Sequence, residues 1–315
     1  MSEDLTLSEI MEHSHKSGSK LSLLIGNGLL YSHPCPEISN VLNVKEQSQF
    51  LEKVFEKCKN IAVNHPELIL EEVRIALMTH FLDFYINNFP EKMTDFFKKY
   101  NYSCHNFLRK FKNIFTTNYD PLIYWSCLQD VKLFDDGIFG ELPHSIDEIE
   151  QALREMSYKI PLYYLHGAYH FYYIMKEDQQ YVIKKSTSGM RDLSKYLREY
   201  VDNRKNNPDQ KPLIVMEDRD FIKKELIQNN AYLEFCFRQF TKIEGQLLVY
   251  GLSFETDQHL LQAICENKKL DTVYITYRQK GKKDKLRKAL PKNTTNVFFI
   301  KIENERDGQL IWSPI

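Results

Sequence analysis

The chain has 315 residues, a length that suits one large domain or two of moderate size. With 43% hydrophobic residues, including 20 Phe and 19 Tyr, it can bury a substantial core. Its 42 Lys and Arg residues almost balance its 43 Asp and Glu residues, and this near-neutral charge argues against a protein whose main task is to coat nucleic acid.

The N-terminal segment, residues 1–20, has no apolar signal core. No apolar stretch reaches the ~20 residues that a membrane-spanning helix needs. The chain has six cysteines but no Cys-x-x-Cys pair, which argues against a zinc ribbon. We therefore expect a cytoplasmic protein with reduced thiols, no membrane contact and no metal site.

The first elements in chain order are a short helix and a buried strand. Thr6 and Glu9 have the spacing of a capping box, which predicts that a helix begins there. The run LSLLIGNG, residues 21–28, reads as a buried strand that ends in a glycine turn. From about residue 44 to residue 112 the pattern is mostly helical. Within it, one apolar stripe with helical spacing is typical of core, and it comprises Leu70, Val73, Leu77, Phe81 and Phe84.

Strands and helices then alternate to the end of the chain. The run FKNIFTTNYD, residues 111–120, predicts a second strand, and Ser145 with Glu148 forms a capping box for the next helix. Further strands are expected at residues 160–174, 211–217, 245–254, 271–277 and 296–302, with helices at residues 191–204, 220–240 and 256–268. This order predicts a Rossmann-like doubly wound parallel sheet, in a single domain spanning residues 1–315, with a helical insertion at about 44–112 after the first strand.

Residues 278–292, RQKGKKDKLRKALPK, form the most basic stretch of the chain. A solvated helix face is the interpretation we favour for it. A contact with nucleic acid or with an acidic partner is the alternative.

Unusual polar sets follow four of the predicted strands. These sets are the glycine turn at 26–28, residues 117–120, residues 166–167 and residues 251–253, the last followed by Asp257 and His259. Ligands of open parallel sheets bind beyond the carboxyl ends of the strands, so the repeated placement of polar groups there indicates a binding site.

Each set taken alone has an ordinary explanation. The fingerprint G-x-G-x-x-G is interrupted by Tyr31, so the glycines suit a plain turn as well as a phosphate cradle. Asn and Asp often cap turns and helices. His166 can be structural, and in a strand it would lie about 13 Å from His170, too far for the two to share zinc. Asp257 and His259 most simply belong to the first turn of a helix.

In this order, the motifs LLIGNG, FTTNYD, YYLHG and VYGLSF…D resemble those of sirtuin-like proteins. They look most like the prokaryotic sirtuin-like branch of antiphage defence, whose members cleave NAD+. The resemblance covers the core from about Leu21 to the final strands and the insertion only loosely. The turn reads Gly-Asn-Gly where sirtuins have Gly-Ala-Gly, and the four zinc cysteines of protein-deacylating sirtuins are absent.

The resemblance implies roles for the polar strand ends. Asn118 corresponds to the catalytic asparagine of the family, Asp120 to an acidic residue that orders the ribose site, and His166 to the histidine of LHG. The resemblance further implies a dinucleotide lined by Gly26, Gly28, Gly251 and Ser253, to which we add Asn27, Thr117 and Asp257.

These residue types suit cleavage of the nicotinamide–ribose bond, because nicotinamide leaves as a neutral group and the ribose becomes oxocarbenium-like. Asn118 can fix a ribose hydroxyl and orient a water molecule, His166 can accept a proton, and Asp120 can supply negative potential. This assignment expects the Asn118 amide and the His166 imidazole to converge on one sugar-sized hollow.

The function expected from the sequence is therefore that of an NAD+ glycohydrolase, with NAD+ as substrate and no prosthetic group. The resemblance implies a regulated antiviral effector that forms homo-oligomers or works with a partner such as a DNA-translocating ATPase, without strong direct binding to nucleic acid. Three alternatives remain: a non-catalytic sensor of NAD+ or ADP-ribose, a sirtuin-type deacylase, and a scaffold without a ligand. A scaffold predicts that the four polar strand ends diverge in space.

Overall fold

The computed structural model describes residues 5–16, 21–33, 79, 92–100, 102–185, 190–203, 210–215, 220–290 and 296–314. The apolar stripe predicted between Leu70 and Phe84 lies outside these residues, as does most of the predicted helical insertion. Its last part is described and contains α5 (Met93–Tyr100), β2 (Tyr102–Ser103) and α6 (His105–Leu108).

A seven-stranded parallel sheet forms the centre of the fold, in the order β11-β10-β9-β1-β3-β5-β4. The predicted strands appear as β1 (Leu21–Ile25), β3 (Ile114–Thr116), β5 (Ile160–Tyr164), β9 (Gly245–Tyr250), β10 (Leu270–Tyr277) and β11 (Val297–Lys301). The edge strand β4 (Phe134–Asp135) was not predicted, because two residues are too few to show the alternation of apolar and polar side chains that indicates a strand.

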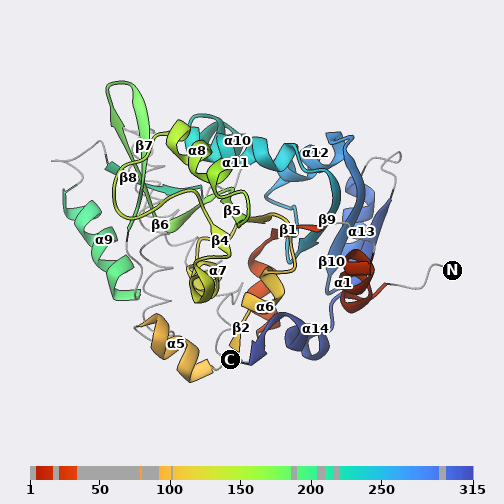
Figure 1. Ribbon diagram of the computed structural model, residues 1–315. Coiled ribbons are helices and arrows are strands. Elements are labelled where there is room, and N and C mark those ends of the chain that lie inside the picture. Colours follow the sequence, from red (N-terminus) through yellow and green to blue (C-terminus); the bar gives the residue numbers. More distant parts are fainter. Residues whose placement is uncertain are drawn as a thin grey trace, which may run out of the picture.

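Helices cover both faces of this sheet, so the fold is the expected Rossmann-like α/β arrangement (Figure 1). One face carries α8 (Ile146–Glu155), α10 (Asp220–Gln228), α11 (Ala231–Thr241) and α12 (Gln258–Glu266). The other carries α1 (Leu7–Lys16), α6, α7 (Leu122–Cys127) and α14 (Asn304–Ile311). Burial from both sides explains why β1 is apolar except for Ser22, with all five of its residues buried.

Both predicted capping boxes are present. At the start of α1, the Glu9 N–H donates to Thr6 Oγ1 and the Thr6 N–H donates to Glu9 Oε2. At the start of α8, Ser145 and Glu148 make the same reciprocal pair. The single helix expected at residues 220–240 is instead two, α10 and α11, because the Asn230 side chain accepts from the Leu233 N–H and caps a new helix.

A second, three-stranded antiparallel sheet was not predicted. It consists of β7 (Gln179–Lys184), β6 (Gly167–Lys176) and β8 (Gln210–Ile214), in that order. The β-prone run at residues 160–174 therefore contains two strands, β5 in the parallel sheet and β6 in the small one, separated at His166. The strand expected at residues 211–217 is β8, and it pairs with β6 and not with the parallel sheet.

The turn between β5 and β6 requires glycine. Gly167 has φ +74°, and a Cβ at this position would lie 1.8 Å from the carbonyl oxygen of Leu213 in β8. The Val215 N–H, just after β8, donates to the His166 carbonyl. The small sheet thus holds His166 at the carboxyl end of β5.

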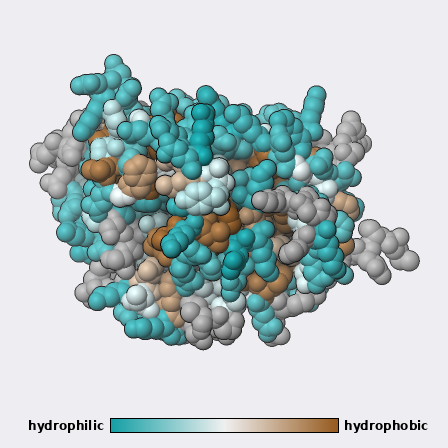
Figure 2. Space-filling view, viewed as in Figure 1, coloured by the Kyte–Doolittle hydropathy of each residue, from teal (hydrophilic) through white to brown (hydrophobic). Residues whose placement is uncertain are grey.

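The remaining elements are η1 (Asn27–Ser32), η2 (Leu128–Asp130), α9 (Met190–Asn203), α13 (Lys280–Ala289) and β12 (Ser313–Pro314). Figure 2 shows one side of the surface, where hydrophilic side chains cover most of the area and hydrophobic ones gather near the middle. Among the residues that the structure describes, no helix is both long enough and apolar enough to span a bilayer.

Candidate functional site

The glycine turn after β1 packs directly against the turn after β9. The Gly26 N–H donates to the Tyr250 carbonyl and the Gly28 N–H donates to the Gly251 carbonyl, both at 2.9 Å. A Cβ on Gly28 would lie 2.4 Å from the Cα of Gly251, and Gly251 itself has φ +70°. The glycines are therefore required by the close approach of two neighbouring strand ends.

Arg278, the first residue after β10, holds the same turn from the other side. Its guanidinium donates to the Gly28 carbonyl and to Ser32 Oγ, both at 2.8 Å. Ser32 Oγ also makes a short hydrogen bond with the Tyr250 hydroxyl. The ends of β1, β9 and β10 thus form one hydrogen-bonded unit.

A cavity of about 660 Å³ opens beyond these strand ends. Its walls come from the carboxyl ends of β1, β3, β5, β9 and β10, from the start of α12, and from α10 and α13. The chain runs from β1 toward β3 on one side and reaches β9 on the other, so the cavity lies where the strand order reverses. This is where open α/β sheets bind their ligands.

All four polar strand ends meet around this cavity. The predicted residues that line it are Asn27, Gly28, Thr117, His166, Gly251, Ser253 and Asp257. The divergence that a scaffold without a ligand predicts is therefore not observed. Three predicted residues, Gly26, Asn118 and Asp120, do not line the cavity, and all three are buried beside it.

Asn118 is fully buried between two lining residues, Thr117 and Tyr119. Its backbone N–H is satisfied by Thr116 Oγ1 at 3.0 Å. Its side-chain amide makes no hydrogen bond of full geometry among the described residues, but it lies close enough to the Asp120 carboxyl to help lower the pKa of that group. The amide therefore has hydrogen-bonding capacity left for a further partner. His166 lines the cavity and Asn118 does not, so the expected convergence of the two side chains on one hollow stays a prediction.

Asp120 is almost wholly buried below the cavity. Burial raises the pKa of its carboxyl to about 6, although the Leu122 N–H donates to Oδ1 at 2.9 Å and partly offsets that rise. A carboxyl with this pKa is still mostly ionised at pH 7 and becomes neutral only below about pH 6, so the role expected of Asp120 stays a prediction.

The raised pKa makes Asp120→Asn a test of this environment. An unfolded Asp titrates near ~3.9, so protonation favours the folded state, and this stability is lost as the pH rises through about 6. Asn cannot ionise and keeps the acceptor for Leu122. We expect the unfolding free energy of the variant, relative to wild type, to increase by roughly 3 kcal/mol between about pH 4 and pH 8.

Urea unfolding across this pH range measures the difference. The exposed Asp284→Asn is the matched control for the loss of one carboxylate. A difference between Asp120→Asn and wild type that does not vary with pH contradicts the raised pKa.

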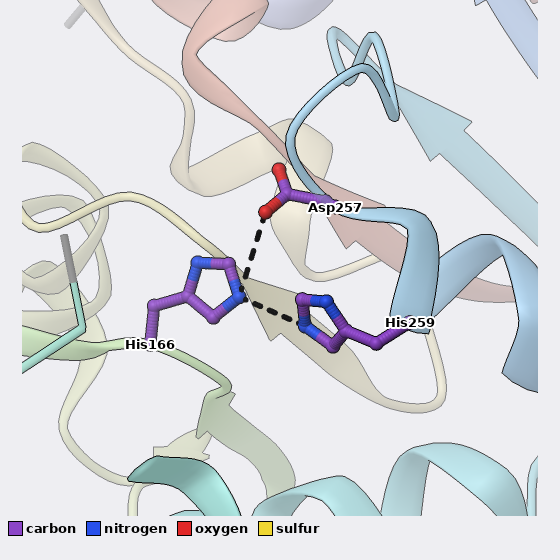
Figure 3. A group of neighbouring side chains, drawn as sticks. All are labelled: His166, Asp257 and His259. Carbon is purple, nitrogen blue, oxygen red and sulfur yellow. Dashed lines mark hydrogen bonds and ion pairs between the residues drawn. The ribbon is translucent and has the colours of Figure 1, made fainter. Parts of the chain in front are cut away.

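His166 belongs to a buried cluster that the sequence did not predict (Figure 3). Its Nε2 lies 3.3 Å from Nε2 of His259 and 3.8 Å from Oδ1 of Asp257. Lys223 Nζ donates to the same Asp257 oxygen at 2.6 Å. Burial by itself would raise the pKa of Asp257, but His166, Lys223 and His259 together hold it below its usual value.

His170, the other histidine considered from the sequence, lies elsewhere. Its ring stacks on Tyr124 with centroids 4.7 Å apart and meets Tyr164 edge-on. Burial holds the pKa of His170 well below its ordinary value. The histidine beside His166 is thus His259.

Sequence reasoning missed the site roles of Lys223, His259 and Arg278. Lys223 lies in α10, whose helical pattern gave no sign of a buried cation. His259 follows Asp257 by two positions, and this spacing after a polar strand end was an available signal. Arg278 was read as part of a solvated basic helix, and most of that helix is indeed exposed.

The cavity carries an excess of positive charge. Four cationic and two acidic side chains line it, namely Lys223, Arg278, Lys282, Lys285, Glu255 and Asp257. Both acids are paired, Asp257 with Lys223 and Glu255 with Lys285 at 3.5 Å. Such a cavity favours an anionic ligand.

Comparison with protein families gives one result. Residues 44–302 match a family described as "Domain of unknown function (DUF4917)". The match begins after the first glycine turn and covers the other three polar strand ends. Comparison with curated proteins finds no match.

Proposed function

We propose that this chain, which belongs to the DUF4917 family, is an NAD+ glycohydrolase that releases nicotinamide and ADP-ribose. One observation carries the proposal: a single cavity at the carboxyl edge of the parallel sheet brings together the glycine turn, Thr117 and His166. The family description names no activity, so the argument rests on the site and on the resemblance to sirtuin-like NADases.

The position and size of the cavity suit a dinucleotide. Nucleotides bind at the point where the strand order of an open α/β sheet reverses. Ligand pockets of this kind commonly have volumes of about 300–1,000 Å³, and this cavity falls within that range.

The charges and the backbone suit a diphosphate. Gly28 and Gly251 pack against each other and bring two main-chain segments to the cavity wall. Arg278 and Lys282 add positive charge at the wall formed by the end of β10 and by α13. These features support binding of the phosphates of NAD+.

His166 supplies the general base in this proposal. It lines the cavity, and its partner His259 gives a second imidazole to share a proton with. Nicotinamide leaves neutral, so the chemistry needs a held ribose, a proton acceptor and one water molecule. In this proposal the Asn118 amide, which lies beside the Asp120 carboxyl, would bond to a ribose hydroxyl and orient that water once the ligand is bound.

Asn118→Ala tests the proposal. We expect the rate of nicotinamide release from NAD+ to fall by about 10²–10³-fold, the usual cost of losing one preorganised polar group. Nicotinamide release is measured on purified protein, with the proteins encoded beside it present. The exposed Asn106→Ala, away from the cavity, is the matched control. Turnover by Asn118→Ala equal to that of wild type contradicts the assignment.

A non-catalytic sensor of NAD+ or ADP-ribose is the second candidate, and one observation favours it. The Asn118 side chain is buried outside the cavity lining, so a ligand can be held there without contact to the predicted catalytic amide. Calorimetry with NAD+, run beside the nicotinamide assay, separates the two candidates. Binding without release in any condition supports the sensor.

The wider biological role rests on the resemblance alone. We propose a regulated effector that depletes NAD+ during antiviral defence, because unrestrained hydrolysis would kill the cell. Homo-oligomers or a partner such as a DNA-translocating ATPase would supply the restraint. A sirtuin-type deacylase would consume NAD+ only when an acylated peptide is present, so assays with and without such a peptide distinguish it.

A further inference from the structure

We propose that His166, His259 and Asp257 form a binding site for a divalent transition-metal ion such as Zn²⁺. The two imidazoles come from segments far apart in the chain, His166 from the turn after β5 and His259 from the first turn of α12 (Figure 3). Asp257 is the N-terminal cap residue of α12. Two imidazoles and one carboxylate form a donor set that suits Zn²⁺ and similar ions.

The distances match tetrahedral coordination. An ion bonded at ~2.0–2.1 Å to two imidazole nitrogens holds them ~3.3–3.4 Å apart at a tetrahedral angle. The two Nε2 atoms here are 3.3 Å apart. Oδ1 of Asp257 lies 3.8 Å from Nε2 of His166, and the three ligand atoms lie within 4.8 Å of one another. Only a small movement of the carboxylate completes the site.

In the absence of an ion the two facing Nε2 atoms make a hydrogen bond, in which one imidazole in its Nε2–H tautomer donates to the other. A metal ion would take the place of that proton between the rings. His166 is 1% and His259 is 2% exposed, so bulk water does not separate them. The fold thus holds two nitrogen ligands ready at metal-binding distance.

An ion can reach the site and keep an open coordination position. His166 and Asp257 line the large cavity, while His259 lines a smaller cavity of about 170 Å³ beside it. A fourth ligand, a water molecule or a ligand oxygen, can therefore enter from the large cavity. Three protein ligands with one open position form the arrangement typical of accessible zinc sites.

Lys223 opposes metal binding and so provides a sensitive test. Its ammonium lies 2.6 Å from Oδ1 of Asp257, which both occupies a ligand atom and adds positive charge. Removing this charge should tighten binding of a divalent cation. Removing His259 should weaken it, because even the loss of an outer-shell partner of a metal ligand costs ~10–100-fold in affinity.

The experiment titrates protein freed of metals by a chelator with Zn²⁺ in competition with a fluorescent chelator. We expect His259→Gln to bind Zn²⁺ at least ~10-fold more weakly than wild type and Lys223→Met to bind it more tightly. His13→Gln, an exposed histidine in α1, is the matched control and should bind as wild type does. Co²⁺ in the same site should give the intense visible bands of tetrahedral coordination, and these bands should be lost in His259→Gln.

Equal Zn²⁺ affinity in wild type, His259→Gln and Lys223→Met overturns the proposal, as does a Co²⁺ spectrum of the hydrated octahedral ion. If His259→Gln does not fold, shown by circular dichroism, Lys223→Met decides alone through the direction of its change.

The consequence for catalysis rests on the proposed function. An ion bound to Nε2 of His166 blocks the proposed base, so Zn²⁺ should inhibit NAD+ turnover by the wild-type protein. The inhibition should be as strong in the control His13→Gln and weaker in His259→Gln. Zinc binding without turnover under any condition supports the metal site and removes the hydrolase proposal. Turnover without zinc binding removes the metal site alone.

Discussion

Replacing His166 with Gln is expected to lower the rate of nicotinamide release from NAD+ by about 10²–10⁴-fold, the usual contribution of a general base. The imidazole lines the cavity beside His259 and Asp257, where it can take a proton from a ribose hydroxyl or from water. Gln keeps a polar side chain at this position but cannot accept and carry a proton at neutral pH. The expected loss is in kcat, with a smaller change in KM.

The control for this prediction is the same substitution at an exposed site, His13→Gln, which should leave the rate unchanged. The fold around residue 166 should survive, because its carbonyl still accepts from the Val215 N–H in the variant. Calorimetric binding of NAD+ to His166→Gln shows whether the cavity is intact. A variant that binds and hydrolyses NAD+ at the wild-type rate excludes His166 as the base.

Gly28→Ala is expected to cause the largest loss of stability among the changes considered. The new Cβ would lie 2.4 Å from the Cα of Gly251 and 2.8 Å from its carbonyl oxygen, so two main-chain segments must separate. Overpacking in a core usually costs about 1–3 kcal/mol and occasionally more. Because the obstacle here is backbone that belongs to the central sheet edge, we expect at least about 3 kcal/mol.

Chemical denaturation followed by circular dichroism measures this loss. Gly281→Ala is the matched control, since no heavy atom lies within 4 Å of the Cβ that this change adds in α13. Ala is the better helix former by about 0.5–1 kcal/mol, so the control should be slightly more stable than wild type. Equal stability of Gly28→Ala and Gly281→Ala contradicts the close packing of the two turns.

The central sheet could be predicted because its signals are local and strong. Strands such as β1 and β9 are mostly apolar on both faces and do not alternate, which is typical of strands in a sheet that is covered on both sides. The capping boxes at Thr6 and Ser145 each involve residues three positions apart, so they can be read without knowing the fold. The polar residues that follow four of the strands are also a local signal, so they could be recognised in the sequence before the structure showed that they surround one cavity.

The antiparallel sheet could not be predicted in the same way. The strand β8 has the composition of a buried strand, and its sequence does not say which neighbour it pairs with. Pairing with β6 is decided by the turn at Gly167, where the main chain of β8 comes too close for any side chain. The two helices α10 and α11 were merged for a related reason, since Asn230 acts as a cap only once the chain bends there.

The sequence by itself determined the parallel α/β core, the carboxyl edge where a ligand would bind, and the residue types at that edge, because all of these follow from short-range pattern and from one rule of sheet topology. Only the tertiary structure decided that His259 and Lys223 join His166 and Asp257, and that Asn118 lies buried behind the cavity wall. Contacts between residues such as His166 and His259, 93 positions apart, depend on how helices pack onto the sheet, and that packing leaves no periodic trace in the sequence.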